Sequence, residues 1–211
     1  KKAVFEEGWL TLAELREALA ANFAGKEALL KRLLHRYPKF GNDAADVDAI
    51  AAEIAECFCR EVMQHRDPVL GACWPGIYTY HRYKGIGHMA GATPDGRLAG
   101  EPTSENQGPA AGRDRCGPTA TLRSLAKLPL YLTPSGGQTL TLHPSLVSGR
   151  DGTKRLGDLI ETYFSLGGEH LQINIVNTET LRAAQREPDR YRGLVVRVTG
   201  YSAYFVTLDR Q

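Results

Sequence analysis

The chain has 211 residues, of which 42% are apolar and 24% charged, and this mixture supplies enough apolar surface for one sizeable core. The net charge of +2 comes from lysines and arginines dispersed among acidic residues, which argues against nucleic acid as a partner. No apolar run reaches the roughly 18 to 20 residues that span a bilayer, and the first residues lack the apolar core of a signal peptide. We therefore expect a soluble cytoplasmic protein.

The first seventy residues are predicted to form three packing helices. Thr11 and Glu14 have the spacing of a capping box, and leucines at helical intervals follow them. A second leucine-rich stripe occupies residues 29–34, and breakers at residues 37–43 separate it from a third helix that ends near Pro68. The apolar stripe of this third helix consists of Val47, Ile50, Ile54, Phe58 and Val62.

Residues 71–117 are rich in glycine and proline, and so long an irregular stretch indicates a loop that is clamped by other structure and functional. The run GIGHMAG from residue 85 has its third glycine one place late for a dinucleotide-binding loop, and no clear strand precedes it. In the run GATPDGR, Asp95 and Arg97 either pair to fix the loop or face a substrate cavity, and the structural role is favoured.

The last third alternates strands and helices, which predicts an α/β fold. The predicted strands are residues 139–143, 170–176, 194–198 and 204–208, and the predicted helices are residues 157–164 and 178–186. In the second of these strands His170, Gln172 and Asn174 share one face, because alternate residues of a strand point the same way. This polar row lines a site or forms a structural row of hydrogen bonds.

The four cysteines, Cys57, Cys59, Cys73 and Cys116, form no CxxC pair and no disulfide framework, so reduced thiols are expected. Cys57 and Cys59 lie two apart on a predicted helix and face different ways, which disfavours a shared metal and favours buried thiols. The histidines lie at no metal-ligand spacing, and the HExxH, P-loop and GxSxG motifs are missing. We expect no metal site.

The run RVTGYSAYF, residues 197–205, contains a glycine between a β-branched and an aromatic segment, which by itself indicates only a hairpin turn. It resembles, however, the glycyl radical motif of the superfamily that includes pyruvate formate-lyase, glycerol dehydratase and choline trimethylamine-lyase. The glycine of that motif is Gly200 here. Four further segments resemble the family in the family's order, namely residues 38–48, 91–102, 117–129 and 170–201.

The resemblance implies the carboxy-terminal part of a ten-stranded glycyl radical enzyme β/α barrel, with packing helices before it and a glycyl radical loop. We expect a helical packing segment at residues 1–70 and barrel-completing loops, strands and helices at 71–193. Residues 194–211 would hold the radical loop and the start of a tail. In the family the strand that carries His170, Gln172 and Asn174 lies next to the radical loop.

The resemblance also implies that a radical S-adenosylmethionine iron-sulfur activating enzyme installs a radical on Gly200, and that no cofactor is bound otherwise. Only glycine offers two α-hydrogens and a centre free to flatten. Radical-loop support is expected from Arg197, Val198, Thr199, Tyr201 and Phe205. An apolar shell that keeps the loop dry, or ordinary packing within the fold, is expected of Val196, Val198, Tyr204 and Phe205.

The family's catalytic cysteine, usually followed by a glutamate, lies in a segment that this chain does not contain, and none of its own cysteines matches it. We expect a split enzyme in which a larger subunit supplies the cysteine loop for radical cleavage of a C–O, C–N, C–S or C–C bond in a small substrate. A bacterial microcompartment is a possible location. The alternatives are a repair module for an oxygen-damaged enzyme, a pyruvate formate-lyase-like acyltransferase subunit, a scaffold without a radical, and a fragment of one long polypeptide.

Overall fold

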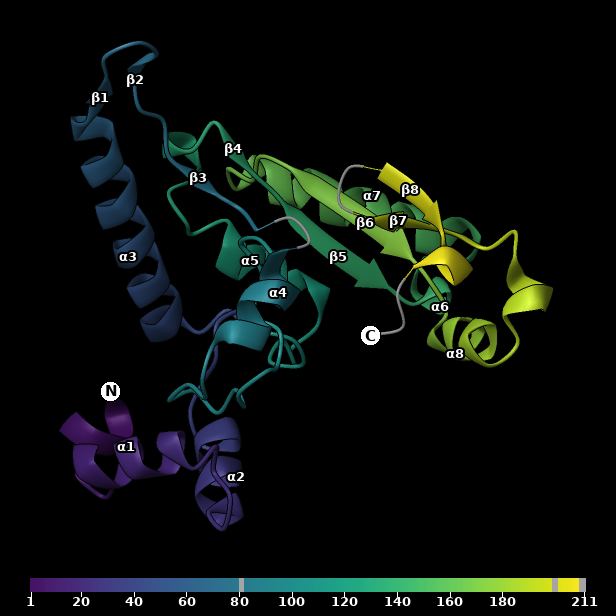
Figure 1. The fold of residues 1–211 in the computed structure, drawn as a ribbon. Helices are drawn as coiled ribbons and strands as arrows, with labels where there is room; N and C mark the ends of the chain where they lie inside the picture. The colour runs from purple at the N-terminus through teal and green to yellow at the C-terminus, as the bar shows by residue number, and fades with distance from the viewer. Residues whose placement is uncertain (80–81, 199–200, 209–211) are drawn as a thin grey trace.

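The computed structural model describes residues 1–79, 82–198 and 201–208, which form helices and short strands in a mixed arrangement (Figure 1). The amino-terminal helices lie at one end of the molecule. The strands β5 (Gln138–Leu142) and β6 (Leu171–Ile175) cross its middle, and the last strands lie at the opposite end together with α8 (Thr178–Arg186) (Figure 1). No helix in these three ranges is long and apolar enough to span a membrane.

The first helices form as the sequence predicts. A short π-helix at Lys2–Glu6 precedes α1 (Leu12–Ala20) and α2 (Glu27–His35). The capping box is present in both directions, because the Glu14 amide donates to Thr11 Oγ1 at 3.2 Å and the Thr11 amide donates to Glu14 Oε2 at 2.8 Å. A core centred on Phe23 and Leu33 joins these helices.

Helix α3 (Ala45–Gln64) is confirmed as a helix, but Ile50, Ile54 and Phe58 of the predicted stripe are exposed, whereas Val47 and Val62 are half-buried. Small residues face inward instead: Ala51 and Ala55 contact the core, and Cys59 is fully buried. Cys57 is exposed, so the expectation that both thiols are buried is wrong for this one. The two cysteines face different ways, as their spacing predicts.

The long irregular stretch contains more regular structure than the sequence suggests. Its elements are β1 (Arg66–Asp67), β2 (Gly71–Ala72), β3 (Gly76–Ile77) and α4 (Arg82–Met89), and α5 (Pro118–Leu125) follows. The GIGHMAG run lies mostly on α4, and Gly87 packs against the backbone of residues 101–102. A helix there confirms that the run is not a phosphate-binding loop between a strand and a helix.

The central pair of strands is parallel. β4 (Ser135–Gly136) pairs with β3, and β5 (Gln138–Leu142) pairs with β6 (Leu171–Ile175), with α6 (Pro144–Val147) and α7 (Gly149–Ser165) between them. Helix α7 begins eight residues before the predicted start at residue 157. Gly152 does not break the helix, and its lack of a side chain lets the helix pack closely on Val147. A Cβ there would lie 2.4 Å from the Val147 carbonyl carbon.

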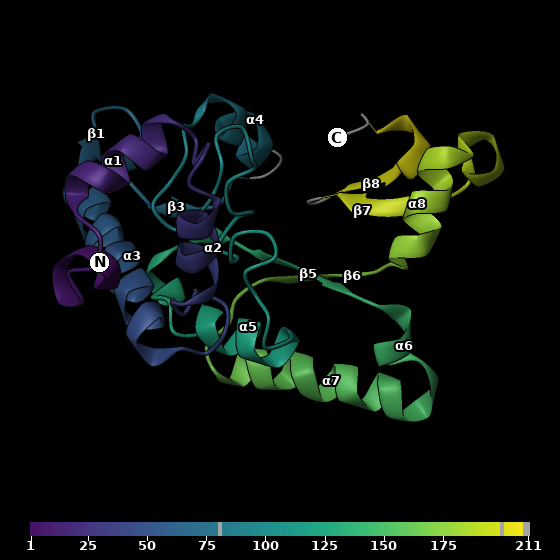
Figure 2. The same cartoon turned by 90° about the horizontal axis from the view of Figure 1, so that it is seen from below.

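The main core lies between β5–β6 and the helices α5 and α7. Its buried members are Leu122, Leu125, Leu128, Leu130, Leu140, Leu142 and Tyr163. Figure 2 shows α5 and α7 together on one side of the two strands. Parallel strands joined through helices confirm an α/β arrangement, and the sheets described in this chain are all two-stranded.

The carboxy-terminal part begins with α8 (Thr178–Arg186), as predicted, and a turn of 3-10 helix at Pro188–Tyr191 follows. β7 (Val195–Val198) and β8 (Tyr201–Tyr204) are antiparallel. The predicted strand at 204–208 is wrong, because pairing with β7 places the strand earlier and Phe205–Thr207 form a 3-10 turn.

A buried carboxylate joins α3 to α5. Asp48 is fully buried, and its Oδ2 accepts hydrogen bonds from Ser124 Oγ at 3.0 Å and from Lys127 Nζ at 2.8 Å. Lys127 also contacts Asp43 at 2.6 Å, and the two carboxylates raise the pKa of its ammonium. The ammonium therefore holds together two carboxylates at the start of α3.

We expect Lys127→Met to destabilise the protein by about 2 kcal/mol. Removing one partner of a fully buried ion pair costs roughly 3 to 5 kcal/mol, and the cost is smaller here because the Lys127 side chain is 39% exposed. The variant leaves Asp48 charged and buried without its cation. Adding Asp48→Asn should recover part of the loss, since a neutral amide needs no cation. Urea unfolding of the single and double variants measures both effects, and equal stability of wild type and Lys127→Met would contradict them.

Candidate functional site

The described part of the motif that contains Gly200 includes the end of β7, all of β8 and the start of the 3-10 turn at Phe205. The strands pair from Val195 with Tyr204 to Val198 with Tyr201. Thr199 and Gly200 themselves lie outside the described residues, and only the backbone of Arg197, Val198 and Tyr201 is described. The structure therefore places the two strands that flank the radical motif but not the glycine.

The base of this hairpin is fastened to the rest of the carboxy-terminal part. The Phe205 amide donates to the Leu194 carbonyl at 2.8 Å, and α8 contacts the 3-10 turn that Phe205 begins. Phe205 and Val196 are half-buried, whereas Tyr204 is 54% exposed. In this chain, the Tyr204 side of the expected apolar shell is therefore exposed to solvent.

The predicted polar row forms one face of the β5–β6 pair. The register places Gln172 beside Thr139 and Asn174 beside Thr141, and paired residues of parallel strands point to the same side. Leu140 and Ile173 point to the opposite side, into the main core. Figure 2 shows α5 and α7 on the core side of the sheet and the β7–β8 hairpin on the other side, so the polar face and the hairpin share that side. The two threonines were not predicted as part of this face, although their alternation with leucines in TLTLH indicates it.

His170 lies just before β6 and is exposed. Its Nδ1 lies 3.3 Å from the Gly136 carbonyl oxygen, and the ring covers Gly137, where a Cβ would approach Nδ1 to 2.3 Å. Next to it, burial raises the pKa of the Glu169 carboxyl. His170 therefore ties the start of β6 to the end of β4.

Two buried glutamines near this point were also missed. Gln107 and Gln138 are each 6% exposed. A Cβ on Gly136 would lie 2.1 Å from Gln107 Nε2, and a Cβ on Gly108 would lie 2.7 Å from Gln138 Oε1. Gly136 and Gly108 therefore leave room for the two side-chain amides. In the sequence, the adjacent glycines 136 and 137 just before β5 were the available sign of this close packing.

Arg97 is buried and fixes its own loop. Its guanidinium donates to the carbonyls of Leu98 at 3.1 Å, Glu101 at 2.7 Å and Gly91. Asp95 is exposed and accepts a hydrogen bond from Thr93 Oγ1. The two residues do not form an ion pair in the described chain, because Arg97 uses backbone oxygens as acceptors instead.

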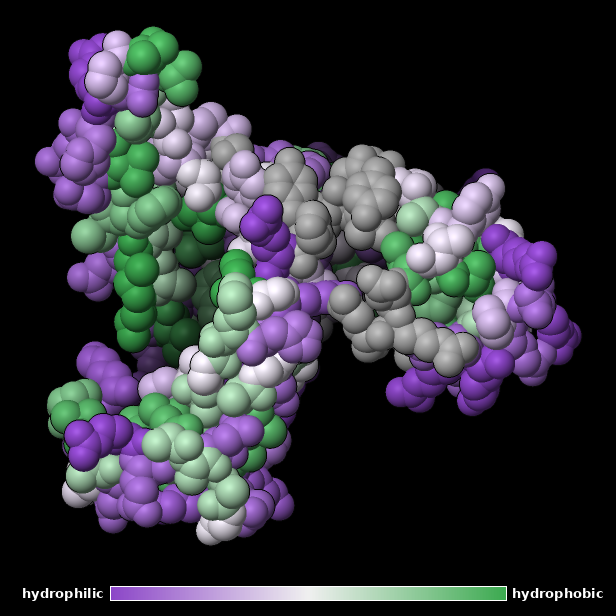
Figure 3. Space-filling model, in the orientation of Figure 1, coloured by the Kyte–Doolittle hydropathy of each residue, from purple (hydrophilic) through white to green (hydrophobic). Residues whose placement is uncertain are grey.

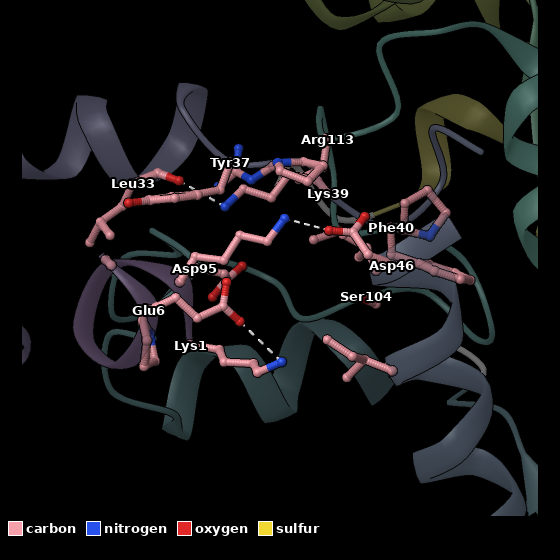
Figure 4. A pocket seen from close by; sticks show the side chains of 18 of the residues that line it. Lys1, Glu6, Leu33, Tyr37, Lys39, Phe40, Asp46, Asp95, Ser104 and Arg113 are labelled. Carbon is pink, nitrogen blue, oxygen red and sulfur yellow. Dashed lines mark hydrogen bonds and ion pairs between the residues drawn. The ribbon is translucent and has the colours of Figure 1, made fainter. Parts of the chain in front are cut away.

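A cavity of about 780 Å³ lies between the amino-terminal helices and the loop that carries Asp95 (Figure 4). Lys39 Nζ donates to the Leu33 carbonyl at 2.7 Å, and burial lowers the pKa of this ammonium. Lys1 and Glu6 form an ion pair of 3.1 Å on another side. Asp95 lines this cavity, whereas His170, Gln172 and Asn174 do not, so the cavity does not bring Asp95 together with the polar row.

The cysteines lie away from the hairpin or on the surface. Cys57 and Cys59 belong to α3, which lies at the opposite end of the molecule from β7 and β8 (Figures 1 and 2). Cys116 is exposed and Cys73 half-buried. Burial raises the pKa of the Cys59 thiol, which disfavours the reactive thiolate. Within the three described ranges, no group of three His, Cys, Asp or Glu residues is arranged to hold a metal ion.

Residues 103–206 match the family model described as glycine radical, and residues 1–87 match the one described as pyruvate formate lyase-like. The chain belongs to the glycyl radical enzyme superfamily and corresponds to its carboxy-terminal, glycyl radical portion.

Individual relatives agree with this assignment over nearly the whole chain. A probable dehydratase of Escherichia coli is 40% identical over 99% of this chain, and an isethionate sulfite-lyase of Nitratidesulfovibrio vulgaris is 37% identical over 99%. The glycerol-bound B12-independent glycerol dehydratase of Clostridium butyricum superposes with a TM-score of 0.94 at 40% identity over 99%. The chain spans 27%, 26% and 27% of these three proteins, respectively.

Proposed function

We propose that this chain stores a radical on Gly200 and passes it to a catalytic cysteine on a partner chain. The observation that carries the proposal is the match of residues 103–206 to the glycine radical model, which includes RVTGYSAYF on the β7–β8 hairpin. The chain is about a quarter of the length of its relatives, which is compatible with a larger partner that supplies the cysteine loop.

The proposed chemistry moves one hydrogen atom at a time. An activating enzyme of the radical S-adenosylmethionine type removes a hydrogen atom from the Gly200 Cα. The glycyl radical then takes the hydrogen atom of the cysteine S–H, which restores glycine and leaves a thiyl radical to attack the substrate. Glycine suits the storage role because no side chain prevents the Cα from becoming planar.

The residues around Gly200 are proposed to hold the loop and to line the site. The radical loop is supported by Arg197, Val198, Thr199, Tyr201 and Phe205. The polar face of β5–β6, with His170, Gln172 and Asn174, lines the site on the side where the hairpin lies. Because Arg97 fixes the loop 91–101 and Asp95 lies at the separate cavity, we assign both residues to the support of that loop.

The proposed organisation has a helical packing segment at 1–70, barrel-completing elements at 71–193 and the radical loop with the start of a tail at 194–211. The parallel pair β5–β6 is proposed to be part of a ten-stranded barrel that the partner completes. The proposed location is the cytoplasm, in a microcompartment if the substrate pathway uses one.

The reaction class is proposed to be radical elimination from a small substrate, by a dehydratase or lyase. The relatives support this class over acyl transfer, because they are named as dehydratases and a sulfite-lyase. The relatives' names differ in the group removed, so the bond broken depends on residues outside this portion. A repair module is less well supported, because it needs only the loop and its immediate supports, whereas this chain also has packing helices.

Oxygen tests whether the radical is on Gly200. We expect anaerobically activated protein to break at Gly200 on exposure to air, because dioxygen adds to a carbon-centred backbone radical and the backbone is then cleaved. Mass spectrometry should find a fragment that ends at Thr199, and protein exposed to air without activation should stay whole. Intact activated protein would favour a scaffold without a radical.

A further inference from the structure

Three large apolar residues of α3 are exposed in this chain, although the first of them, Ile50, also lines the cavity beside the amino-terminal helices. Ile50 is 43% exposed, Ile54 65% and Phe58 46%, while the inward face of the same helix has alanines and Cys59. In a helix that packs only within its own domain, the large apolar residues face the core. Figure 3 shows the apolar column along the whole of α3.

The apolar column continues onto the β1–β2 turn at the carboxyl end of α3 (Figures 1 and 3). Val69 and Leu70 at the tip are 89% and 85% exposed. Asp67 Oδ1 accepts hydrogen bonds from the amides of both residues, at 2.8 and 2.7 Å, which fixes the turn. A turn held in this way presents two apolar side chains to a partner with little entropy left to lose.

We propose that the α3 stripe (Ile50, Ile54 and Phe58), extended by Val69 and Leu70, is the docking surface for the larger, cysteine-bearing part of the enzyme. This inference rests on the proposed function, because it takes the larger partner as given. The partner surface would be an apolar groove with lysines or arginines at its rim. The residues at 50, 54 and 58 form an i, i+4 ridge, which packs between the side-chain rows of another helix.

Charge favours this partner over a second copy of the chain. Glu53 and Glu61 are exposed beside the stripe. In an antiparallel pairing of two α3 helices centred on Ile54, Glu53 would lie close to Glu53 of the other copy, and like charges oppose such an interface. A basic rim on a different chain removes the conflict. A partner of this kind is expected from the relatives, because about three quarters of each relative lies outside the part that this chain matches.

The test is a binding titration with the chain and its Ile54→Glu variant. The probe is the remainder of the Clostridium butyricum glycerol dehydratase outside the matched 27%, which is purified separately and added in increasing amounts to each protein. Ala49→Glu is the matched control, because it adds the same charge at an exposed position about 100° around the helix from Ile50. Circular dichroism should show equal helix content in all three proteins, since both positions are exposed.

We expect the wild-type chain and Ala49→Glu to bind the probe with the same affinity and Ile54→Glu to bind at least about tenfold more weakly, a loss of about 1.4 kcal/mol. Failure of the wild type to bind, or equal binding by Ile54→Glu, would overturn the docking proposal. So would a stable dimer of the chain alone in sedimentation that Ile54→Glu abolishes. The Gly200 radical is measured separately, so its absence with intact docking would count against the proposed function alone.

Discussion

The Gly200→Ala variant is expected to show no glycyl signal in electron paramagnetic resonance after anaerobic incubation with a radical S-adenosylmethionine activating enzyme and the larger partner. Wild-type protein under the same conditions should give a doublet, because one hydrogen remains on the radical carbon. Alanine has a single α-hydrogen, and its methyl group crowds the flattened centre. The expected effect is a complete loss of the doublet.

A matched control separates loss of the radical from loss of the fold. Gly193 lies just before β7, and a Cβ there would meet no atom within 4 Å. Gly193→Ala should therefore keep the doublet at the wild-type intensity. A doublet that survives in Gly200→Ala, or one that no competent activating enzyme produces in the wild type, would contradict radical storage on this residue.

A second large effect is expected at Gly87, where alanine should destabilise the protein by about 3 kcal/mol, the upper end for overpacking. A Cβ at this position would lie 2.2 Å from the Glu101 carbonyl oxygen and 2.7 Å from the Pro102 Cα. Both contacts are backbone atoms, which cannot swing away as a flexible side chain does. The helix α4 and the segment 101–102 would have to separate.

Gly85 provides the opposite result on the same helix. It is exposed, and a Cβ there would meet nothing within 4 Å. Gly85→Ala should therefore stabilise the protein by about 0.5 to 1 kcal/mol through better helix propensity. Thermal and urea unfolding of the two variants measures the contrast, and similar stabilities would mean that α4 does not pack closely on residues 101–102.

Local signals predicted the elements well where the energetics are local. The capping box at Thr11 and the boundaries of α8 follow from side-chain and backbone patterns within a few residues. The start of α7 could not be read in this way, because Gly149 and Gly152 look like breakers. Gly152 is there for its close contact with Val147, which only the folded structure shows.

The polar face of β5–β6 was predicted in part. The alternation of His170, Gln172 and Asn174 follows from strand geometry, but the neighbouring Thr139 and Thr141 depend on the register between β5 and β6. The acceptors of Arg97 are backbone oxygens, which no side-chain pattern reveals. The assignment of Gly200 came from the family motif, because a glycine in a hairpin is locally only a turn.

The stripe on α3 shows how a correct periodicity can mislead about its partner. Its spacing predicted a helix with one packing face. The helix is present, but the face that packs on the main core is the one with Ala51 and Ala55. Periodicity gives the direction of an apolar face around a helix axis. It does not say whether the surface that covers the face belongs to the same chain.

The two-stranded sheet β5–β6 has a practical consequence for handling the protein. Each strand has a single neighbour in the part of the chain that the structure describes, so the outer edge of each presents amides and carbonyls that another strand can pair with. Parallel sheets normally have both faces covered. Chain produced without a binding partner should therefore form intermolecular β-structure as its concentration rises, and preparations will be most homogeneous when the complementary protein is made in the same cell.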